Sequence, residues 1–213
     1  MKITRMPVGM IRANCYIIES DSKNAAAVDP GDEFEKIDAF LTENSLTLKK
    51  ILLTHGHFDH IGAVAQLQEK YGAEVYVHAD DAVMLTDRRK SLADDMPYYV
   101  YRPVEEYTTI DEGDKIELDG LCFEVLHTPG HTKGGVCFRC GNALFTGDTL
   151  FKMSMGRTDF PGGSLKEIFL SLGRLGKIKE NLEVYPGHNE TSTLDYERKN
   201  NVYMKGDPYE DSI

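Results

Sequence analysis

Hydrophobic and polar residues alternate, or hydrophobic residues form short uninterrupted blocks, along much of the first half of the chain. This spacing has the period of strands that are half or fully buried. Strands are predicted over residues 2–8, 14–20, 25–28, 50–54 and 75–77. Apolar residues recur at helical spacing elsewhere, and helices are predicted over residues 33–43, 61–71 and 79–89. A turn at Asp29-Pro30-Gly31 precedes the first helix, and Gly72 ends the second.

The second half of the chain repeats this arrangement. Strands are predicted over residues 115–118, 122–127, 135–139, 143–146 and 183–185, and a helix over 164–175. The polar, tyrosine-rich stretch 90–109 has no clear period and is a candidate cover for a cleft. Two strand-rich halves, each followed by helices, predict an α/β fold in which two sheets pack face to face and helices cover their outer faces.

The length and charge of the chain narrow the function classes. A chain of 213 residues can bury a large core within one domain, so we expect residues 1–213 to form a single domain. With 41% hydrophobic residues, the composition is that of a folded protein. The formal net charge of −11 argues against sustained binding to DNA or RNA, because neutralising phosphates needs a basic surface. We therefore expect no nucleic-acid partner.

The beginning of the chain has no long apolar run. Charged and turn-forming residues interrupt it at Arg5, Pro7, Gly9, Arg12 and Asn14. Neither a signal-peptide core nor a membrane span fits this pattern. We therefore expect a cytoplasmic protein without membrane attachment.

Four cysteines are too few and too irregularly spaced for a disulfide framework, so we expect free thiols at Cys15, Cys122, Cys137 and Cys140. The last two have the CxxC spacing of a metal or redox pair, but the sequence has no second pair. Their segment resembles a hairpin that turns at Gly141-Asn142. A functional role for this pair is the minor alternative.

The clearest chemical signal is the run His55-Gly56-His57-Phe58-Asp59-His60, between a predicted strand and a predicted helix. In an extended loop, residues two positions apart point to the same side, so His55 and His57 can hold one metal ion. Asp59 and His60 lie where the next helix begins and are placed to face a second ion. The alternative is a set of unrelated loop residues, but such an accumulation is unusual without a metal.

Three further candidate ligands each follow a predicted strand. They are His131 in Thr128-Pro-Gly-His-Thr132, Asp148 in Phe145-Thr-Gly-Asp-Thr149 and His188 in Tyr185-Pro-Gly-His188. The small residue before each ligand allows the backbone to come close to an ion. These residues can complete two coordination shells.

With these motifs, the chain resembles the metallo-β-lactamase superfamily of hydrolases over nearly its whole length. The resemblance implies an αββα sandwich and two Zn²⁺ ions, with Fe or Mn as alternatives in one or both positions. It implies that one metal is bound by His55, His57 and His131, the other by Asp59, His60 and His188, and that Asp148 bridges both. Asp29 matches a position that supports the metal loop in this family, and a simple turn residue is an equal alternative.

A binuclear centre of this kind is an electrophile, with Asp59 and Asp148 as its catalytic carboxylates. The positive charge of two zinc ions exceeds the negative charge of these two carboxylates and a bridging hydroxide. A net positive charge therefore remains to stabilise a developing oxyanion. Metal binding lowers the pKa of water to about 7, so hydroxide is available at neutral pH. An amine must be protonated to leave, whereas a thiol has a pKa of about 8.5 and leaves as thiolate with little help. No additional general acid is apparent, which is compatible with thioester hydrolysis; an acid supplied from a loop or by water is the alternative.

The runs Gly147-Asp-Thr-Leu-Phe151 and Gly156-Arg-Thr-Asp-Phe160 resemble the hydroxyacylglutathione hydrolase (glyoxalase II) branch. The resemblance implies a small-molecule thioester as partner, such as S-lactoylglutathione. It also implies that Arg157 binds the substrate carboxylate, for which a guanidinium is well suited. The alternative is that Arg157 is an ordinary surface arginine.

The end of the chain departs from the long form of glyoxalase II. Only 25 residues follow His188, too few for a separate helical domain. The chain is more similar to short, single-domain bacterial relatives, whose tail lies near the site. Arg198 and Lys199 are therefore candidates to bind an acidic substrate, although Val202 stands where the family commonly has proline. We expect a monomer or a small homo-oligomer.

Three other functions are compatible with this pattern. A persulfide dioxygenase would hold one iron with His131, Asp148 and either His55 or His57, a two-histidine, one-carboxylate set. A lactone, β-lactam or other ester hydrolase would share the binuclear chemistry. A non-catalytic module is permitted by the fold, but the intact ligand set counts against it.

Two histidines remain outside the proposed ligand set. His127 is expected at the end of a strand, where it supports the structure or a ligand indirectly. His78 is expected to close its strand or to cap the following turn.

Overall fold

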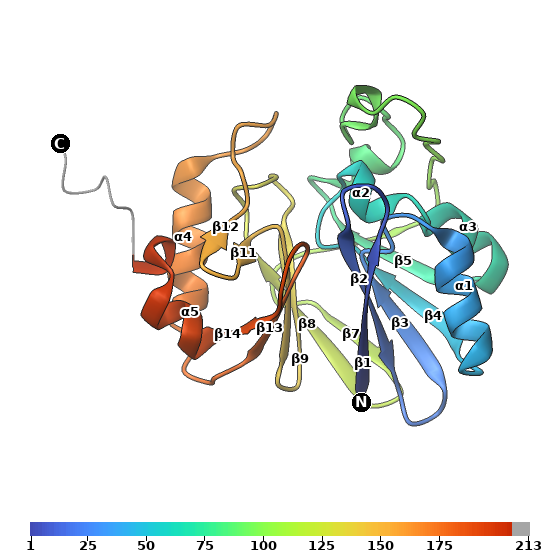
Figure 1. Cartoon of the computed structure of the whole chain (residues 1–213), viewed down its shortest axis with the longest axis horizontal. Coiled ribbons are helices and arrows are strands. Elements are labelled where there is room, and N and C mark those ends of the chain that lie inside the picture. The colour runs from blue at the N-terminus through green and yellow to red at the C-terminus, as the bar shows by residue number, and fades with distance from the viewer. Residues whose placement is uncertain (206–213) are drawn as a thin grey trace.

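Two six-stranded sheets pack face to face in the computed structural model, which describes residues 1–205 (Figure 1). The first sheet contains, in spatial order, β1 (Lys2–Val8), β2 (Ala13–Glu19), β3 (Asn24–Val28), β4 (Thr47–Leu52), β5 (Glu74–His78) and β6 (Thr108–Ile110). Strands β1 to β3 are antiparallel neighbours, whereas β3 to β6 are parallel. Helices cover the outer face of each sheet, so the expected αββα sandwich is confirmed.

The second sheet is mostly antiparallel. In spatial order it contains β14 (Ser192–Thr193), β13 (Glu183–Pro186), β10 (Ala143–Gly147), β9 (Val136–Cys140), β8 (Leu121–His127) and β7 (Lys115–Leu118). Only β10 and β13 pair in parallel. A small hairpin of β11 (Leu150–Phe151) and β12 (Ser154–Met155) follows β10.

Helices α1 (Phe34–Glu43) and α3 (Val64–Tyr71) pack on the first sheet, and α4 (Leu165–Gly176) and α5 (Leu194–Asn200) pack on the second. A single-turn helix, α2 (Phe58–Ile61), begins directly after the histidine run. Three 3₁₀ helices complete the described elements: η1 (Ala82–Leu85), η2 (Ala93–Asp95) and η3 (Val202–Lys205). None of the helices within residues 1–205 is both long and apolar enough to cross a lipid bilayer.

Strand β2 shows why the sequence has uninterrupted apolar blocks. Side chains alternate between the two faces of a strand. Cys15 and Ile17 pack beneath the outer helices of the first sheet, whereas Tyr16 and Ile18 pack between the sheets. Both faces of β2 are buried, so the strand needs apolar residues at nearly every position.

The interface between the sheets is rich in aromatic residues. Tyr16, Phe123, Phe138 and Phe145 are almost fully buried there. The rings of Tyr16 and Phe145 meet edge to face with centroids 5.4 Å apart, a favourable aromatic geometry. The Tyr16 hydroxyl donates a hydrogen bond to the Pro186 carbonyl at 2.7 Å and thereby joins the two sheets beside the loop that carries His188.

The predicted helix over residues 79–89 is wrong. Only η1 forms there, flanked by turns. The Asp87 side chain accepts hydrogen bonds from the backbone of Arg89 and Lys90, and the buried Asp81 carboxylate accepts bonds from distant loops. Aspartates that bond to backbone N–H groups in this way compete with the regular helical pattern.

The unassigned stretch 90–109 contains η2 and the edge strand β6, which the sequence pattern did not reveal. Its loop lies over the histidine run, because the Tyr99 hydroxyl donates a hydrogen bond to the Phe58 carbonyl at 2.8 Å. Leu92, Asp95 and Met96 line the cleft beside the proposed metal ligands. The expectation that this stretch covers a cleft is therefore confirmed for these residues.

Tyr16→Phe is predicted to destabilise the fold by about 1 kcal/mol, the typical net value of one buried hydrogen bond. The Pro186 carbonyl keeps a second donor, the Asn14 amide at 2.9 Å, so the carbonyl is not left unsatisfied. Urea denaturation measures the change. Tyr107→Phe is the control, because Tyr107 is exposed. Equal unfolding free energies for the two variants would contradict this role of the Tyr16 hydroxyl.

Candidate metal centre

All seven predicted metal ligands lie in the segments that follow four strands, at one edge of the sandwich. His55 and His57 follow β4, and Asp59 and His60 lie in α2. His131 follows β8, Asp148 follows β10 and His188 follows β13. The two sheets therefore bring residues from four distant loops to one place, between the β-strand ends.

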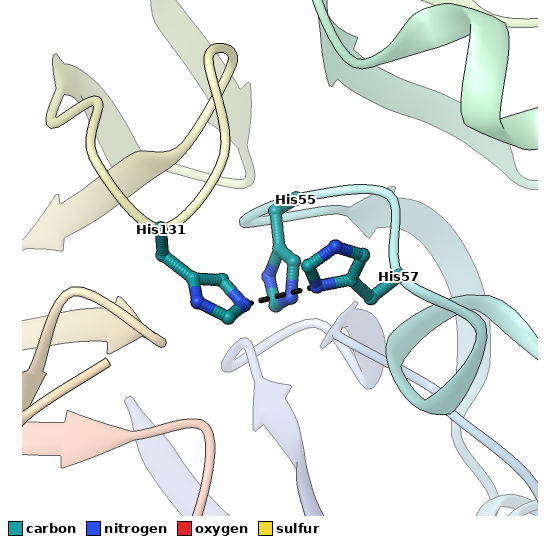
Figure 2. A group of neighbouring side chains, drawn as sticks. All are labelled: His55, His57 and His131. Carbon is teal, nitrogen blue, oxygen red and sulfur yellow. Dashed lines mark hydrogen bonds between the residues drawn. The ribbon is translucent and has the colours of Figure 1, made fainter. Parts of the chain in front are cut away.

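The first group consists of His55, His57 and His131, which are all buried (Figure 2). One ring nitrogen from each lies within 4.8 Å of the others, close enough for the three to hold one ion. The His57 Nδ1 and His131 Nε2 atoms are 2.9 Å apart. The three rings converge from two loops on a common point.

The second group consists of Asp59, His60 and His188, whose ligand atoms are also within 4.8 Å of one another. His188 Nε2 lies 3.2 Å from the Asp59 carboxylate, and His60 Nε2 lies 3.5 Å from it. A carboxylate and two imidazoles form a donor set suited to zinc, iron or manganese.

Asp148 lies between the two groups. One of its oxygens is 3.5 Å from His60 Nε2, and the other is 3.6 Å from His131 Nε2 and 3.7 Å from His188 Nε2. Its oxygens therefore lie within 4.0 Å of Nε2 atoms from both groups. This position fits the bridging role that the family resemblance implied.

Hydrogen bonds behind the imidazoles set the direction of their lone pairs. The Nδ1–H groups of His60 and His131 donate to the Asp29 carboxylate at 3.0 Å and to the Arg157 carbonyl at 2.7 Å. His55 Nδ1 lies 3.1 Å from the Thr54 hydroxyl, which donates to Asp29. These three histidines therefore present Nε2 as an acceptor toward the centre, as metal-binding histidines do.

Asp29 supports the metal loop and is more than a turn residue. One carboxylate oxygen accepts the Thr54 N–H at 2.8 Å, and the other accepts from the Thr54 hydroxyl and from His60 Nδ1. The two Asp29 oxygens lie close to His55 and His60, but each oxygen already accepts a hydrogen bond from these donors. Asp29 therefore positions ligands and is not counted among them.

Asp81 is a second positioning residue, which the sequence did not reveal. It is fully buried and accepts hydrogen bonds from Gly56 N at 3.3 Å, Gly134 N at 2.8 Å and the Thr132 hydroxyl at 2.7 Å. One carboxylate thus joins the loop of His55 and His57 to the loop of His131. Burial raises the pKa of Asp81, and the bonds from Thr132 and the two amides partly oppose this effect.

Three buried polar atoms lack a hydrogen-bond partner within the described part of the chain: His55 Nε2, His60 Nε2 and Asp148 Oδ1. All three belong to the proposed ligands. A buried polar atom without a partner costs about 1–3 kcal/mol. The residues present therefore fit a bound metal cation, which would accept these electron pairs.

The carboxylates and neutral imidazoles around the centre favour the binding of a cation. Burial lowers the pKa of His60, but the carboxylates of Asp59, Asp148 and Asp29 outweigh burial and raise it to about 10. Burial and the neighbouring histidines hold the pKa of His55 well below its usual range. Burial and His131 lower the pKa of His57 to about 3. His55 and His57 are therefore neutral ligands at physiological pH.

Two glycines allow the ligand loops to approach closely. A Cβ atom at Gly31 would lie 1.6 Å from the Asp59 carbonyl oxygen, and one at Gly156 would lie 1.7 Å from the Asp148 carbonyl oxygen. Neither space accepts a methyl group, so the chain needs glycine at both positions.

A cleft of about 570 Å³ opens over the centre. Its polar walls include His57, Asp59, His131, Asp148 and His188. Its apolar walls come from Ile11, Phe58, Leu92, Met96, Phe151, Met155 and Phe160. The cleft combines an apolar lining with converging polar groups, which is typical of a small-molecule site.

Arg157 lines this cleft, but its guanidinium already has a partner. Nε and one terminal nitrogen donate to the two oxygens of Asp159 at 2.7 and 2.6 Å. The guanidinium also stacks on Phe160, with 3.9 Å to the ring centroid. The Asp159 carboxylate occupies one edge of this exposed guanidinium, so a substrate carboxylate would have to share Arg157 with Asp159 or displace it.

The structure places Arg198 and Lys199 away from the cleft, and neither is among its lining residues. The Arg198 guanidinium donates to the Ile178 and Glu180 carbonyls and pairs with Asp195. Lys199 is exposed on α5. The expectation that these side chains approach a substrate is not met by their positions.

Two neighbouring residues on the same tail do support the cleft. The buried Glu197 carboxylate accepts the Met153 N–H at 2.8 Å, and the Asn201 amide donates to the Ser154 carbonyl at 3.0 Å. Both bonds hold the β11–β12 hairpin, which supplies Phe151 and Met155 to the cleft wall. The tail therefore acts on the site through backbone positioning.

His78 and His127 form a separate group with Asp111. Their rings stack with centroids 4.2 Å apart and an angle of 9° between the planes. Imidazole lone pairs lie in the ring plane, so parallel stacked rings do not point at one ion. His78 Nδ1 accepts the Asp80 N–H at 3.2 Å, and His127 Nε2 donates to the Lys133 carbonyl at 2.9 Å. The expected capping and structural roles are confirmed.

The CxxC cysteines do not form a site. Cys137 packs beneath α4, whereas Cys140 lies in the core between the sheets, because residues three apart on a strand face opposite sides. All four cysteines are free. Ala143 pairs with Cys140, which confirms the predicted hairpin.

Gly156→Ala is predicted to weaken metal binding by roughly 10–100-fold, the usual effect of disturbing a residue behind the ligands. The added methyl group would displace Asp148 or the Arg157 carbonyl that orients His131. Competition with a chromogenic chelator measures the affinity. Gly173→Ala is the matched control, because no atom lies within 4 Å of the added Cβ. Unchanged affinity in a folded Gly156→Ala variant would show that this close approach is unimportant.

Comparison with known proteins agrees with this geometry. Residues 8–192 match the family model of the metallo-β-lactamase superfamily. The hydroxyacylglutathione hydrolase GloC of Haemophilus influenzae is 35% identical, over 96% of this chain and 98% of the relative. Among solved structures, the B3 metallo-β-lactamase BLEG-1 has a TM-score of 0.87 and 32% identity, covering 96% of this chain and 100% of that one. TTHA1623 in a di-iron-bound form has a TM-score of 0.85 and 37% identity, covering 94% and 99%. The chain therefore belongs to the metallo-β-lactamase superfamily.

Proposed function

We propose that this protein is a binuclear metallohydrolase that cleaves small-molecule thioesters of the glyoxalase II type. The observation that carries the proposal is the assembly of two complete three-residue ligand groups with Asp148 between them. The likeness to GloC supports hydroxyacyl thioesters such as S-lactoylglutathione as the substrate class.

His55, His57 and His131 would hold one metal ion, and Asp59, His60 and His188 the other, with Asp148 shared. Bound divalent metals supply a hydroxide nucleophile at neutral pH and polarise a carbonyl group. Zinc is the proposed metal, and the di-iron form of TTHA1623 makes iron the alternative to test.

The residues of the chain orient and shield the reacting groups. Asp29 and the Arg157 carbonyl fix the tautomers of His60 and His131, so that Nε2 of each faces the centre. Phe58, Phe151 and Phe160 line the cleft and reduce the access of water to a bound acyl group.

The lining of the cleft also favours a good leaving group. No lysine, tyrosine or cysteine side chain is among the described residues that line it. The cleft therefore offers no such acid to protonate a departing amine, whereas a thiolate leaves with little help. This lining is compatible with thioester cleavage, whereas amide cleavage would need a carboxyl group such as Asp95 or a water molecule to protonate the amine.

We also propose that the enzyme works in the cytoplasm. All four cysteines are free thiols, as is usual for proteins of a reducing compartment.

A mononuclear iron dioxygenase would need only His131, Asp148 and one of His55 and His57. The second group is equally well assembled, and His60 Nε2 is buried without a partner within residues 1–205. A binuclear hydrolase would use this second group as metal ligands. Hydrolysis of β-lactams or lactones is a second candidate, which the likeness to BLEG-1 favours.

The direct test is the metal content of the purified protein together with three assays. We expect two metal ions per chain, hydrolysis of S-lactoylglutathione, and no oxygen uptake with glutathione persulfide. A β-lactam and a lactone are assayed in parallel. One iron per chain with oxygen uptake would falsify the hydrolase proposal, and preferential cleavage of the β-lactam or lactone would replace the thioester.

Asp148→Asn is predicted to lose both metals together, because this carboxylate contacts both groups. The loss in kcat/KM should exceed the roughly 10–100-fold effect of an outer positioning residue. Metal analysis after dialysis measures the stoichiometry. Asp95→Asn is the control, since Asp95 lines the cleft outside both ligand groups. Loss of only one metal from Asp148→Asn would refute bridging.

A further inference from the structure

A second pocket of about 260 Å³ adjoins the cleft on the side of His188. Ile11, His188 and Asn189 line both spaces, so the pocket lies next to the metal centre. Its remaining walls include two arginines, Arg5 and Arg12. This concentration of positive charge is unexpected in a protein with a formal net charge of −11.

Neither arginine is neutralised within the described part of the chain, where no carboxylate lies within 4.0 Å of either guanidinium. Arg5 donates through one terminal nitrogen to the Asn189 carbonyl at 2.8 Å, which leaves its other N–H groups available. Glu190 also lines the pocket; its ion pair with Lys152 at 2.7 Å is the main cause that lowers its pKa, and the charge of Arg5 contributes less, so two arginines face one carboxylate. The pocket therefore keeps a net positive charge.

The position of these arginines relative to His188 is fixed by backbone contacts. Asn14 N donates to the Gly187 carbonyl at 2.7 Å, and the Asn14 side chain donates to the carbonyls of Pro186 and Asn189 at 2.9 and 3.0 Å. These bonds join the β1–β2 hairpin, which carries Arg5 and Arg12, to the loop that carries His188. These bonds fix the backbone that carries the two exposed arginines, and the Arg5 guanidinium is also held by the Asn189 carbonyl.

Arg157, which lines the main cleft, differs in this respect because Asp159 pairs with its guanidinium through Nε and one terminal nitrogen. We propose that Arg5 and Arg12 form a carboxylate-binding subsite that selects thioesters bearing a carboxylate on the His188 side. This inference rests on the proposed thioesterase function. Guanidinium groups bind carboxylates through paired, charge-assisted hydrogen bonds.

The test uses the metal-loaded protein and ligands matched in all but one charge. The first pair consists of acetyl thioesters of 3-mercaptopropionate and 3-mercaptopropionamide. The second pair consists of succinyl and succinamoyl thioesters of a neutral thiol. Together they place the carboxylate on the thiol part or on the acyl part. Thioether analogues, in which CH₂ replaces the thioester carbonyl, give dissociation constants by calorimetry without turnover.

The wild-type protein should bind the carboxylate analogue of one pair about fivefold more tightly than its amide, the size expected for a partly exposed ion pair. Arg12→Gln should abolish this preference by raising KM with kcat nearly unchanged, and Arg12→Lys should retain part of it. Lys49→Ala is the charge-matched control, because Lys49 is exposed and lines neither pocket.

Equal affinity of the wild-type protein for the carboxylate and amide members of both pairs would overturn the subsite. So would a preference that survives in Arg12→Gln. If the analogues bind with an Arg12-dependent preference but no thioester is cleaved, the subsite stands and the thioesterase proposal fails. The two failures are therefore distinguishable.

Discussion

Imidazole and carboxylate groups from four loops are buried together at one edge of two packed sheets, and they need a positively charged partner. Without one, His55 Nε2, His60 Nε2 and Asp148 Oδ1 remain buried without hydrogen bonds in the described part of the chain. Much of the surrounding structure maintains this arrangement. Asp29 and Asp81 bind the ligand loops from behind, and Gly31 and Gly156 let the backbones meet. These two aspartates and two glycines therefore serve to hold the proposed metal ligands in place.

The sandwich explains how such distant residues meet. The parallel strands β4 and β5, and the parallel pair β10 and β13, direct their carboxyl ends toward the same edge. The rigid core between the sheets fixes the distance between the ligand loops, with the Tyr16 hydroxyl as a direct link between β2 and the end of β13. The fold determines where the metals would lie, whereas the loops 90–109 and 150–160 form the walls around a substrate.

Local patterns in the sequence were sufficient for the longer strands, three helices and the seven candidate ligands, but they did not reveal the short strands β6, β11, β12 and β14 or the helix α5. Strand periodicity is visible because residues such as Tyr16 and Ile17 alternate between two buried faces. The ligands were identifiable because each stands in a short motif directly after a strand. The predicted helix over 79–89 failed because Asp81 bonds to residues far away in the sequence, and no local pattern records such contacts.

Long-range contacts also decide which charged residues reach the cleft. The resemblance to short relatives implied that Arg198 lies near the site, yet its guanidinium is bound to the segment 178–180. Arg12, in a turn near the beginning of the chain, lies instead beside His188. Nothing in the local sequence around Arg12 distinguishes it from a surface arginine. Its proposed role depends on the packing of the β1–β2 hairpin against the loop that carries His188, which is far away in the sequence.

The central claim is that the two ligand groups form one binuclear centre. Anomalous diffraction from crystals of the metal-loaded protein, recorded at the absorption edge of the metal found, tests it most directly. The account predicts two anomalous peaks, one among His55, His57 and His131 and one among Asp59, His60 and His188, with Asp148 in contact with both. A single peak at the first group, with the second group empty at saturating metal, would contradict it.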